Sequence, residues 1–301
     1  MRAIILLLAA LTCWSRRVLR CGQQVQTDTP DYYFTSACTR SRMTQVASSY
    51  IGSLVQCKKF AARRRGLALN FVYRDLLYDD VKNYSGPTCL VFDCPEFDVQ
   101  LSFDMDTIFD YYTAYARPMP TINQTCLPRI GVYLVHRERK NFTEARDTCE
   151  SEDGYLADIS NAPKTVQLAS ALAKEHIRKA FVGLSQEEGY FITSQDMPLD
   201  CLRYRAWAPG EPKDNRECAT LSSKGYWYTK DCSKRMPFIC ELQPSGPLRP
   251  CAHLSWRRRN VCREKFGRSF PNQRRWPKCG DPSIEENTFK LPVFKKRKIQ
   301  N

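Results

Sequence analysis

Apolar residues recur along the first third of the chain at two different spacings. Leu54, Cys57 and Ala61 follow a helical period, so the segment that contains them is predicted to be an amphipathic helix. Residues 67–73 and 89–92 are short runs rich in aromatic and branched side chains, which is typical of β-strands. A helix followed by two strands predicts a small α+β domain over residues 31–126.

The ends of this helix also have a sequence signature. Ser53 precedes the apolar period and can cap the first free amides. The run Arg63-Arg64-Arg65 suits the negative end of the helix dipole, and Gly66 is expected to take the left-handed conformation that ends the helix. A ligand patch or a processing site is the alternative interpretation of the arginine run.

Residues 127–243 show a second alternation of helical and strand patterns. Residues 132–135 are predicted to form an edge strand, residues 141–150 and 164–174 two helices, and residues 180–184 a buried strand. The helical positions expected to face the core are Phe142, Ala145, Cys149, Val166, Ala169 and Leu172. The segment 194–215 lacks core periodicity and is expected to project as a loop. These features predict a second α+β domain.

The chain begins like an exported protein. Met1-Arg2 precedes the apolar run 3–11, which resembles a secretory signal and is too short to span a bilayer. We expect residues 1–15 to be a signal peptide, residues 16–30 an N-terminal arm, and the product to be secreted without a transmembrane segment. A buried helix of a cytosolic protein is the alternative.

Cysteine usage agrees with export. The chain has 15 cysteines, no CxxC pair and three dispersed histidines, so disulfides are expected and a metal site is not. Sequons at Asn83, Asn123 and Asn141 are predicted glycosylation sites. No catalytic motif places a nucleophile beside a base, so enzymatic activity is not expected.

Positive charge concentrates in the last 58 residues. The formal net charge of the chain is +14, and residues 244–301 contain 15 Lys and Arg against 4 Asp and Glu. In a secreted protein such a tail favours heparin-like sulfated polysaccharides over nucleic acid. The alternative is a solvated tail that aids solubility or is clipped. The predicted polyanion-binding residues are Arg257, Arg258, Arg259, Arg274, Arg275, Lys295, Lys296, Arg297 and Lys298.

Two stretches resemble the C-type lectin-like domain. They are NFTEARDTCESEDGYLADI from Asn141 and WAPGEPKDNRECATLSSKGYWYTKDCSKRMPFIC from Trp207, with the strand 180–184 between them. The resemblance implies disulfides Cys149–Cys240 and Cys218–Cys232. Cys201 is extra to these two bridges, and its disulfide partner could be Cys126 or a cysteine of the tail.

The same resemblance locates a candidate ligand site, formed by Glu211, Pro212, Lys213, Glu217, Trp227 and Tyr228. In sugar-binding members the equivalent positions hold calcium through a Glu-Pro-Asn triplet, a later Glu, and an Asn-Asp pair after a Trp. Here Lys213 replaces the Asn and Tyr228-Thr229 replaces the pair, so we expect no calcium cofactor. The resemblance further implies a cis peptide before Pro212, while Trp207 and Trp227 are expected to be core or loop anchors. Glu211 is expected either to pair with a base such as Lys213 or to contact ligand.

Residues 31–120 resemble a PAN/apple module. A helix containing Cys57, a strand that opens with Cys89, and the later Tyr111-Tyr112 carry this resemblance, which implies a Cys57–Cys89 disulfide. An unrelated disulfide-stapled α+β domain is the alternative.

Together these patterns predict a secreted recognition or adhesion protein with a PAN/apple-like domain, a C-type lectin-like domain and a basic tail. Its expected partners are extracellular proteins or glycans. Two alternatives stay open: a lectin that works without the usual calcium site, and a secreted inhibitor or toxin-like ligand.

Overall fold

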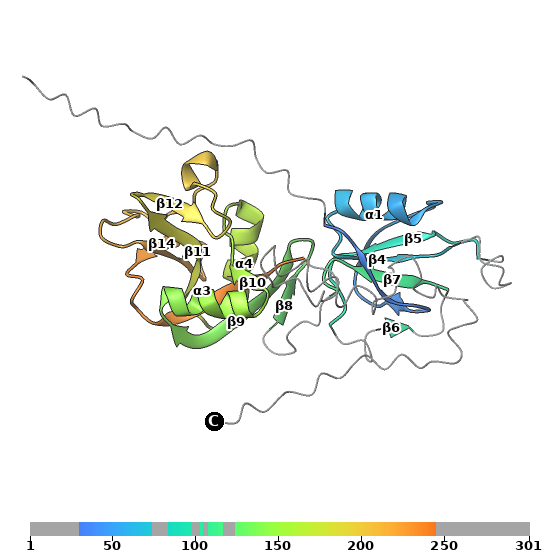
Figure 1. Ribbon diagram of the computed structural model, residues 1–301, viewed down its shortest axis with the longest axis horizontal. Coiled ribbons are helices and arrows are strands. Elements are labelled where there is room, and N and C mark those ends of the chain that lie inside the picture. The colour runs from blue at the N-terminus through green and yellow to red at the C-terminus, as the bar shows by residue number, and fades with distance from the viewer. Residues whose placement is uncertain (1–29, 74–83, 98–102, 105–107, 117–123, 245–301) are drawn as a thin grey trace, which may run out of the picture.

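The computed structural model describes residues 30–73, 84–97, 103–104, 108–116 and 124–244 (Figure 1). The expected signal peptide, Asn83, Asn123 and the predicted polyanion-binding residues lie outside these ranges. Within the described part, no helix has the length and apolar character needed to cross a bilayer. The description therefore centres on two sheets, one in each predicted domain.

The first sheet carries one helix. Its strands run in the order β1-β7-β4-β5-β3, and α1 packs against β4 and β5 through the buried residues Cys57 and Ala61. A short pair, β2–β6, lies beside it. The bounds are β1 Tyr33–Ser36, β2 Arg40–Ser41, β3 Gln45–Ser49, α1 Leu54–Arg63, β4 Ala68–Phe71, β5 Cys89–Phe92, β6 Phe103–Asp104 and β7 Asp110–Thr113. This is an α+β arrangement, and its assignment to the PAN/apple family stays a prediction.

The helix α1 begins at the expected cap, but the left-handed residue after it comes one position earlier than expected. The Ser53 side chain accepts a hydrogen bond from the Gln56 amide. The left-handed residue is Arg65, with φ of 54°, and not Gly66. Gly66 donates its amide to Ala61, and a Cβ on it would lie 2.2 Å from Val91 Cγ1. Gly66 is therefore required by close packing against β5, and the conformational strain falls on Arg65.

Eight strands of the described part form the second sheet. Their order is β14-β13-β11-β15-β9-β8, with β10 paired to β15 and β12 to β11. The bounds are β8 Gln124–Leu127, β9 Gly131–Lys140, β10 Gly154–Leu156, β11 Lys179–Glu187, β12 Tyr190–Thr193, β13 Cys218–Ser222, β14 Trp227–Lys230 and β15 Met236–Leu242. The prediction of an edge strand at residues 132–135 is wrong, because β8 covers the outer side of β9.

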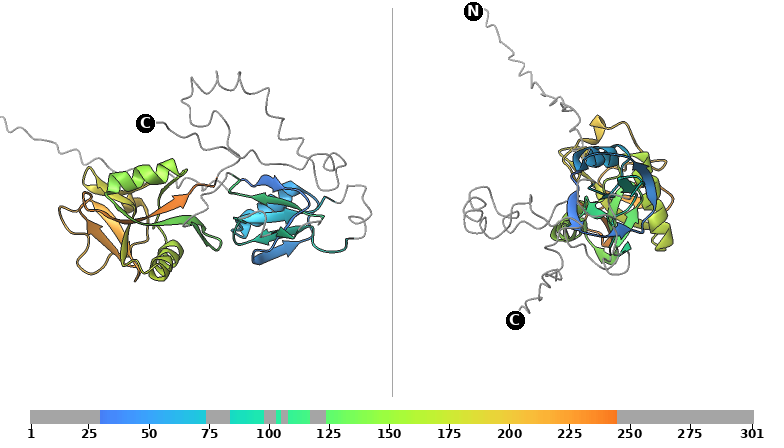
Figure 2. Two further views of the ribbon diagram at one scale, coloured as in Figure 1. Left: turned by 90° about the horizontal axis from the view of Figure 1, so that it is seen from below. Right: turned by 90° about the vertical axis from the view of Figure 1, so that its right-hand side faces the viewer.

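Helices α3 (Phe142–Ser151) and α4 (Ala162–Lys174) lie on opposite sides of this sheet (Figure 2). Asn141 and Glu144 form a capping box at the start of α3. In α4 the expected inward position of Val166 is wrong, because this side chain is 64% exposed. The buried stripe contains Leu168, Ala169 and Leu172, and Val166 falls outside it.

Four disulfides join these elements. Cys57–Cys89 ties α1 to β5, Cys149–Cys240 ties α3 to β15, and Cys218–Cys232 closes the β13–β14 hairpin; these are the pairs that the two resemblances imply. The fourth bridge, Cys94–Cys126, joins the segment after β5 of the first sheet to β8 of the second sheet, although the predicted boundary at residue 126 left both cysteines in the first domain. Cys201 is also disulfide-bonded, and the Cys94 bridge excludes Cys126 as its partner.

The two domains meet through a common apolar cluster. Leu67 and Tyr115 of the first domain pack in the same cluster as Val132 and Leu134 of the second. Across the same junction the Arg129 amide donates to the Asp93 carbonyl at 2.9 Å. Because apolar packing, a backbone hydrogen bond and a disulfide all cross the junction, the domains form one continuous structure.

Candidate ligand-binding site

The loop before β13 is held against β14 by Glu211. The Glu211-Pro212 peptide is cis, as the resemblance implies. One carboxylate oxygen of Glu211 accepts hydrogen bonds from the Thr229 amide, at 2.9 Å, and from the Thr229 hydroxyl. The same hydroxyl accepts from the Lys213 amide at 3.0 Å. The Glu211 carboxylate therefore serves as an acceptor that fixes the loop.

The surroundings of Glu211 favour its ionised form. Partial burial pushes the pKa of this carboxyl upward, but the Thr229 hydrogen bonds and the charges of Lys213 and Arg216 outweigh burial and lower the pKa below its usual value. Glu211 is thus a carboxylate within a positively charged neighbourhood. The structure adds a bond with Thr229 to the two expected roles, pairing with a base and contact with ligand, which stay predictions.

Positive charge gathers on the outer face of β14. Trp227 and Thr229 are buried there, while Tyr228 and Lys230 alternate with them and face outward. The Lys179 ammonium lies 3.2 Å from the centroid of the Tyr228 ring, a cation–π contact.

The charges of this face interact with one another. Burial lowers the pKa of Lys179, and the positive charges of Lys230, Lys213 and Arg216 lower it further, against an opposing effect of Glu211. We call Lys179, Lys213, Arg216 and Lys230, together with the Tyr228 ring, the cationic face. Of the charges that act on Lys179, three are cations and one is the Glu211 carboxylate.

Aromatic packing supports the loop from behind. Trp227 is fully buried, and its ring contacts Trp207 and Tyr204 edge to face, each with ring centroids 5.5 Å apart. The guanidinium of Arg205 donates to the carbonyls of Leu199, Leu202 and Tyr204. The two tryptophans are therefore anchors, as the sequence predicts, and the 194–215 loop is held by specific contacts.

Comparison with known proteins identifies the fold. The family model of the lectin C-type domain matches residues 138–242. The C-type lectin lectoxin-Lio3 of Erythrolamprus poecilogyrus is 32% identical over 128 residues, which are 39% of this chain and 78% of that protein. The chain belongs to the C-type lectin family.

Other C-type lectins match the same region. Collectin-10 of Gallus gallus is 32% identical over 115 residues, 36% of this chain and 41% of the collectin, so the chain spans about two fifths of the collectins that it matches. Among solved structures, the carbohydrate-recognition domain of the mouse scavenger receptor C-type lectin aligns with 42% of this chain and 98% of that chain, at 20% identity and a TM-score of 0.38.

The residues of this C-type lectin site do not fit calcium. Calcium takes six to eight oxygen ligands. At the aligned positions only Glu211 and Glu217 have carboxylates, and one oxygen of Glu211 is already bonded twice by Thr229. Lys213 adds a cation to the loop, and Tyr228 points its ring to Lys179. The donor set lacks the oxygens that the ion requires.

Sequence reasoning located the loop and missed part of the cationic face. Lys179, Arg216 and Lys230 were not among the candidates, because only the pairing of β11, β13 and β14 brings them to one face. Of the candidates, Lys213 and Tyr228 belong to the face, Glu211 and Pro212 shape the loop, Trp227 lies in the core, and Glu217 is exposed. The strand alternation at residues 227–230 was the available signal for Lys230.

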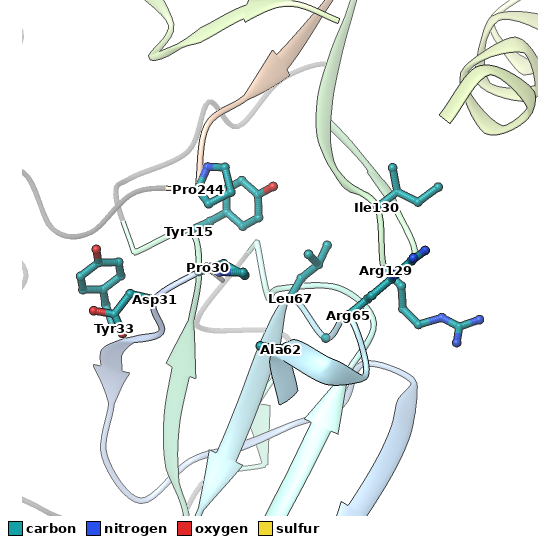
Figure 3. Close-up of a pocket in the computed structure, with 12 residues that line it drawn as sticks. Pro30, Asp31, Tyr33, Ala62, Arg65, Leu67, Tyr115, Arg129, Ile130 and Pro244 are labelled. Atoms are coloured by element: carbon teal, nitrogen blue, oxygen red, sulfur yellow. The ribbon is translucent and has the colours of Figure 1, made fainter. Parts of the chain in front are cut away.

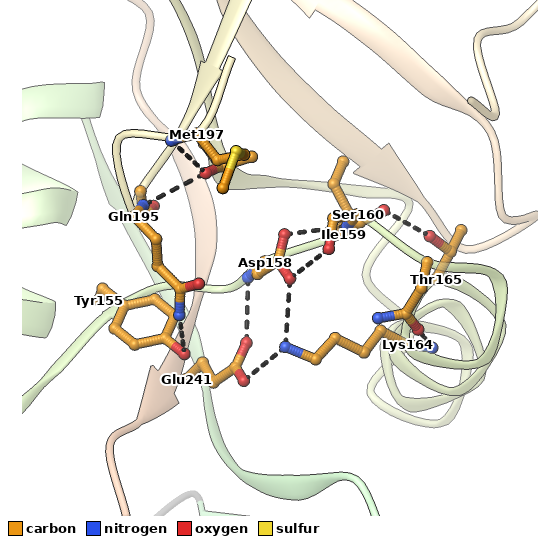
Figure 4. A network of polar contacts seen from close by, with 12 residues as sticks. Tyr155, Asp158, Ile159, Ser160, Lys164, Thr165, Gln195, Met197 and Glu241 are labelled. Carbon is orange, nitrogen blue, oxygen red and sulfur yellow. Dashed lines mark hydrogen bonds and ion pairs between the residues drawn. The ribbon is translucent and has the colours of Figure 1, made fainter. Parts of the chain in front are cut away.

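A second charged cluster lies inside the domain (Figure 4). The Lys164 ammonium is 2.7 Å from a Glu241 carboxylate oxygen and 3.2 Å from one of Asp158. The other Glu241 oxygen accepts from the Asp158 amide at 3.1 Å, and Ser160 donates to Asp158. The three charged side chains are mostly buried and bonded to each other, which indicates a structural role.

Proposed function

We propose that this C-type lectin module is an extracellular recognition domain that binds a sulfated glycan through its cationic face and without calcium. The observation that carries the proposal is that the four cations of this face lie close enough to act on one another, at the position where calcium-dependent members of the family hold their ion. Lys179, Lys213, Arg216 and Lys230 can donate charge-assisted hydrogen bonds to sulfate oxygens. The Tyr228 ring offers an apolar surface beside them for a sugar face.

The basic tail supports the same class of ligand. Residues 244–301 carry the largest excess of positive charge in the chain, and anionic polysaccharides are the polyanions available outside a cell. In this proposal the cationic face supplies the oriented contacts and the tail adds attraction that salt weakens. The function is binding, and no catalytic step is part of it.

The test is affinity for a heparin oligosaccharide, measured with the full chain at several salt concentrations, with calcium and with a chelator. We expect binding that falls with salt and does not change with the chelator. Lys179→Gln and Lys230→Gln should each weaken binding about two- to fivefold, the range for exposed charge contacts. Lys174→Gln, on the exposed surface of α4, is the matched control.

Charge-neutral variants of residues 295–298 separate the tail from the face. If they abolish binding while the cationic-face variants have no effect, the tail alone is the site and the proposal for the C-type lectin module is wrong. Chelator-sensitive binding that Glu211→Gln abolishes would show a calcium site instead.

A further inference from the structure

A cleft of about 620 Å³ lies where the two domains meet (Figure 3). Six of its twelve lining residues are proline, alanine, leucine or isoleucine, and the others are a glycine, two tyrosines, two arginines and one aspartate. The residues that the argument uses are Ala62, Leu67 and Ile130 on the apolar surface, and Arg65 and Arg129 at one side. This volume falls within the range of small-molecule sites. The cleft lies on the first domain and the junction, away from β14.

The walls of the cleft are preformed. Leu67 and Tyr115 contribute to the apolar cluster that crosses the junction. The Leu67 amide donates to Phe92 and its carbonyl accepts from the Ala114 amide, so strands of the first sheet hold this wall in place. The Cys94–Cys126 bridge limits movement of one domain against the other. A ligand would therefore meet a surface that needs little reorganisation.

The charges of the cleft are unequal. Arg65 and Arg129 are both exposed, at left-handed turn positions with φ of 54° and 60°. Neither makes a side-chain hydrogen bond or ion pair with any residue that the structure describes. Burial raises the pKa of the nearby Asp93, and the charge of Arg129 offsets part of that rise. Asp31 lies on the other side (Figure 3), and its carboxylate forms an ion pair with Lys58 at 3.0 Å. One side is thus cationic, and the surface between the sides is aliphatic.

We propose that this cleft binds a fatty acid, with the carboxylate between Arg65 and Arg129 and the alkyl chain along Ala62, Leu67 and Ile130. Charge complementarity selects the carboxylate, because the two guanidinium groups make no hydrogen bond or ion pair with the described residues and can each donate two hydrogen bonds. The aliphatic part of the lining suits an alkyl chain, because the polar groups of a sugar or a peptide backbone placed against it would lack hydrogen-bond partners. This site would make the Arg63-Arg64-Arg65 run both a helix end and part of a ligand contact.

Calorimetry of the full chain with sodium dodecanoate, below its micelle concentration, tests the proposal. We expect saturable binding of one molecule per chain, weakened at least tenfold in Arg65→Gln/Arg129→Gln. Arg64→Gln is the matched control, because it removes a neighbouring arginine that does not line the cleft. Decanoate should bind more weakly by up to about fourfold for each missing methylene. Dodecyltrimethylammonium, which has the same tail and the opposite charge, should not bind.

Three results would overturn the proposal: no saturable binding, equal binding by the double variant, or equal binding by the cationic amphiphile. Thermal unfolding of each variant checks the fold. If the double variant has a much lower melting temperature than wild type, the dodecanoate affinity of Arg129→Gln alone is the test. The heparin measurement tests the cationic face separately from the cleft. Lys179→Gln should leave dodecanoate binding unchanged, and Arg129→Gln should leave chelator-insensitive heparin binding nearly unchanged.

Discussion

Two glutamates of the C-type lectin domain have opposite electrostatic surroundings. Glu241 on β15 is 6% exposed, and burial raises its pKa although Lys164 bonds to it. Glu211 is only partly buried, and hydrogen bonds from Thr229 with the nearby charges of Lys213 and Arg216 outweigh burial and lower its pKa. Burial favours the neutral form of the Glu241 carboxyl, whereas hydrogen bonds and nearby cations favour the anionic form of Glu211.

The contrast extends to the clusters around them. In the buried cluster the Lys164 ammonium bonds to two carboxylates, and the Asp158 amide also donates to the Glu241 carboxylate. The cationic face gathers positive charge at the surface of the protein, where salt screens it. Burial requires internal pairing, so the first cluster supports the fold. Exposure tolerates an excess of one charge, so the second is available for an anionic partner.

The largest expected effect comes from the bridges that hold each region. Cys149→Ala/Cys240→Ala opens a loop of 91 residues beside Glu241, and Cys218→Ala/Cys232→Ala opens one of 14 beside the cationic face. The loop-entropy model expects losses of about 4 to 5 and about 3 kcal/mol in the free energy of unfolding. Urea unfolding of both double variants measures the two losses. The opposite ranking would mean that the exposed region depends more on its bridge than loop length predicts.

Lys164→Met should cost nearly as much. It leaves the carboxylates of Asp158 and Glu241 buried without their cation, and breaking a buried pair by removing one partner costs about 3 to 5 kcal/mol. Urea unfolding at neutral pH gives the loss. The triple variant with Asp158→Asn and Glu241→Gln removes the stranded charges and should recover part of the stability. A loss below about 1 kcal/mol for Lys164→Met would show that water reaches the cluster.

Features that depend on neighbours along the chain were predictable from sequence. The cap at Ser53 and the helix beginning at Asn141 are local, since each side chain bonds an amide three residues on. The bridges Cys149–Cys240 and Cys218–Cys232 and the cis peptide before Pro212 came with the resemblance to C-type lectins. The Cys57–Cys89 bridge came with the PAN/apple resemblance, and Cys94–Cys126 was not predicted. None of the predicted features requires knowledge of which strands pair.

Features that depend on tertiary packing were not predictable. The left-handed residue is Arg65 because Gly66 is needed against Val91, a contact across the sheet. Val166 was assigned to the core because one apolar residue fits several helix faces equally well. The cationic face draws on β11, β14 and the loop before β13, so its composition appears only when those segments meet. The same holds for the cleft between the domains.

Acid titration should separate the two glutamates by sign. The lowered pKa of Glu211 contributes stability above its unfolded value of 4.5, and that contribution is lost as pH falls through the folded pKa. The raised pKa of Glu241 acts oppositely, because the native state binds this proton more tightly and gains stability as pH falls through the folded pKa. Melting temperatures between pH 7 and 3 for wild type, Glu211→Gln and Glu241→Gln test this.

Toward low pH, wild type should lose its advantage over Glu211→Gln and improve relative to Glu241→Gln. If the difference in melting temperature from wild type changes with pH in the same way for both variants, the two carboxyls have the same electrostatic environment. Asp158→Asn is a control within the buried cluster. It removes a negative charge that raises the pKa of Glu241, so the gain in stability toward low pH should become smaller.

The smallest effect on stability should come from the cationic face itself. Lys179→Met loses a cation–π contact with Tyr228, worth about 0.5 to 1 kcal/mol at exposed sites. It also removes repulsion from Lys213, Arg216 and Lys230, so the two changes partly cancel and the net change in unfolding free energy should stay within about 0.5 kcal/mol. The same variant should weaken heparin binding severalfold. A side chain whose removal weakens heparin binding but hardly changes the free energy of unfolding serves recognition. If Lys179→Met lost as much unfolding free energy as Lys164→Met, the two clusters would not differ in this respect.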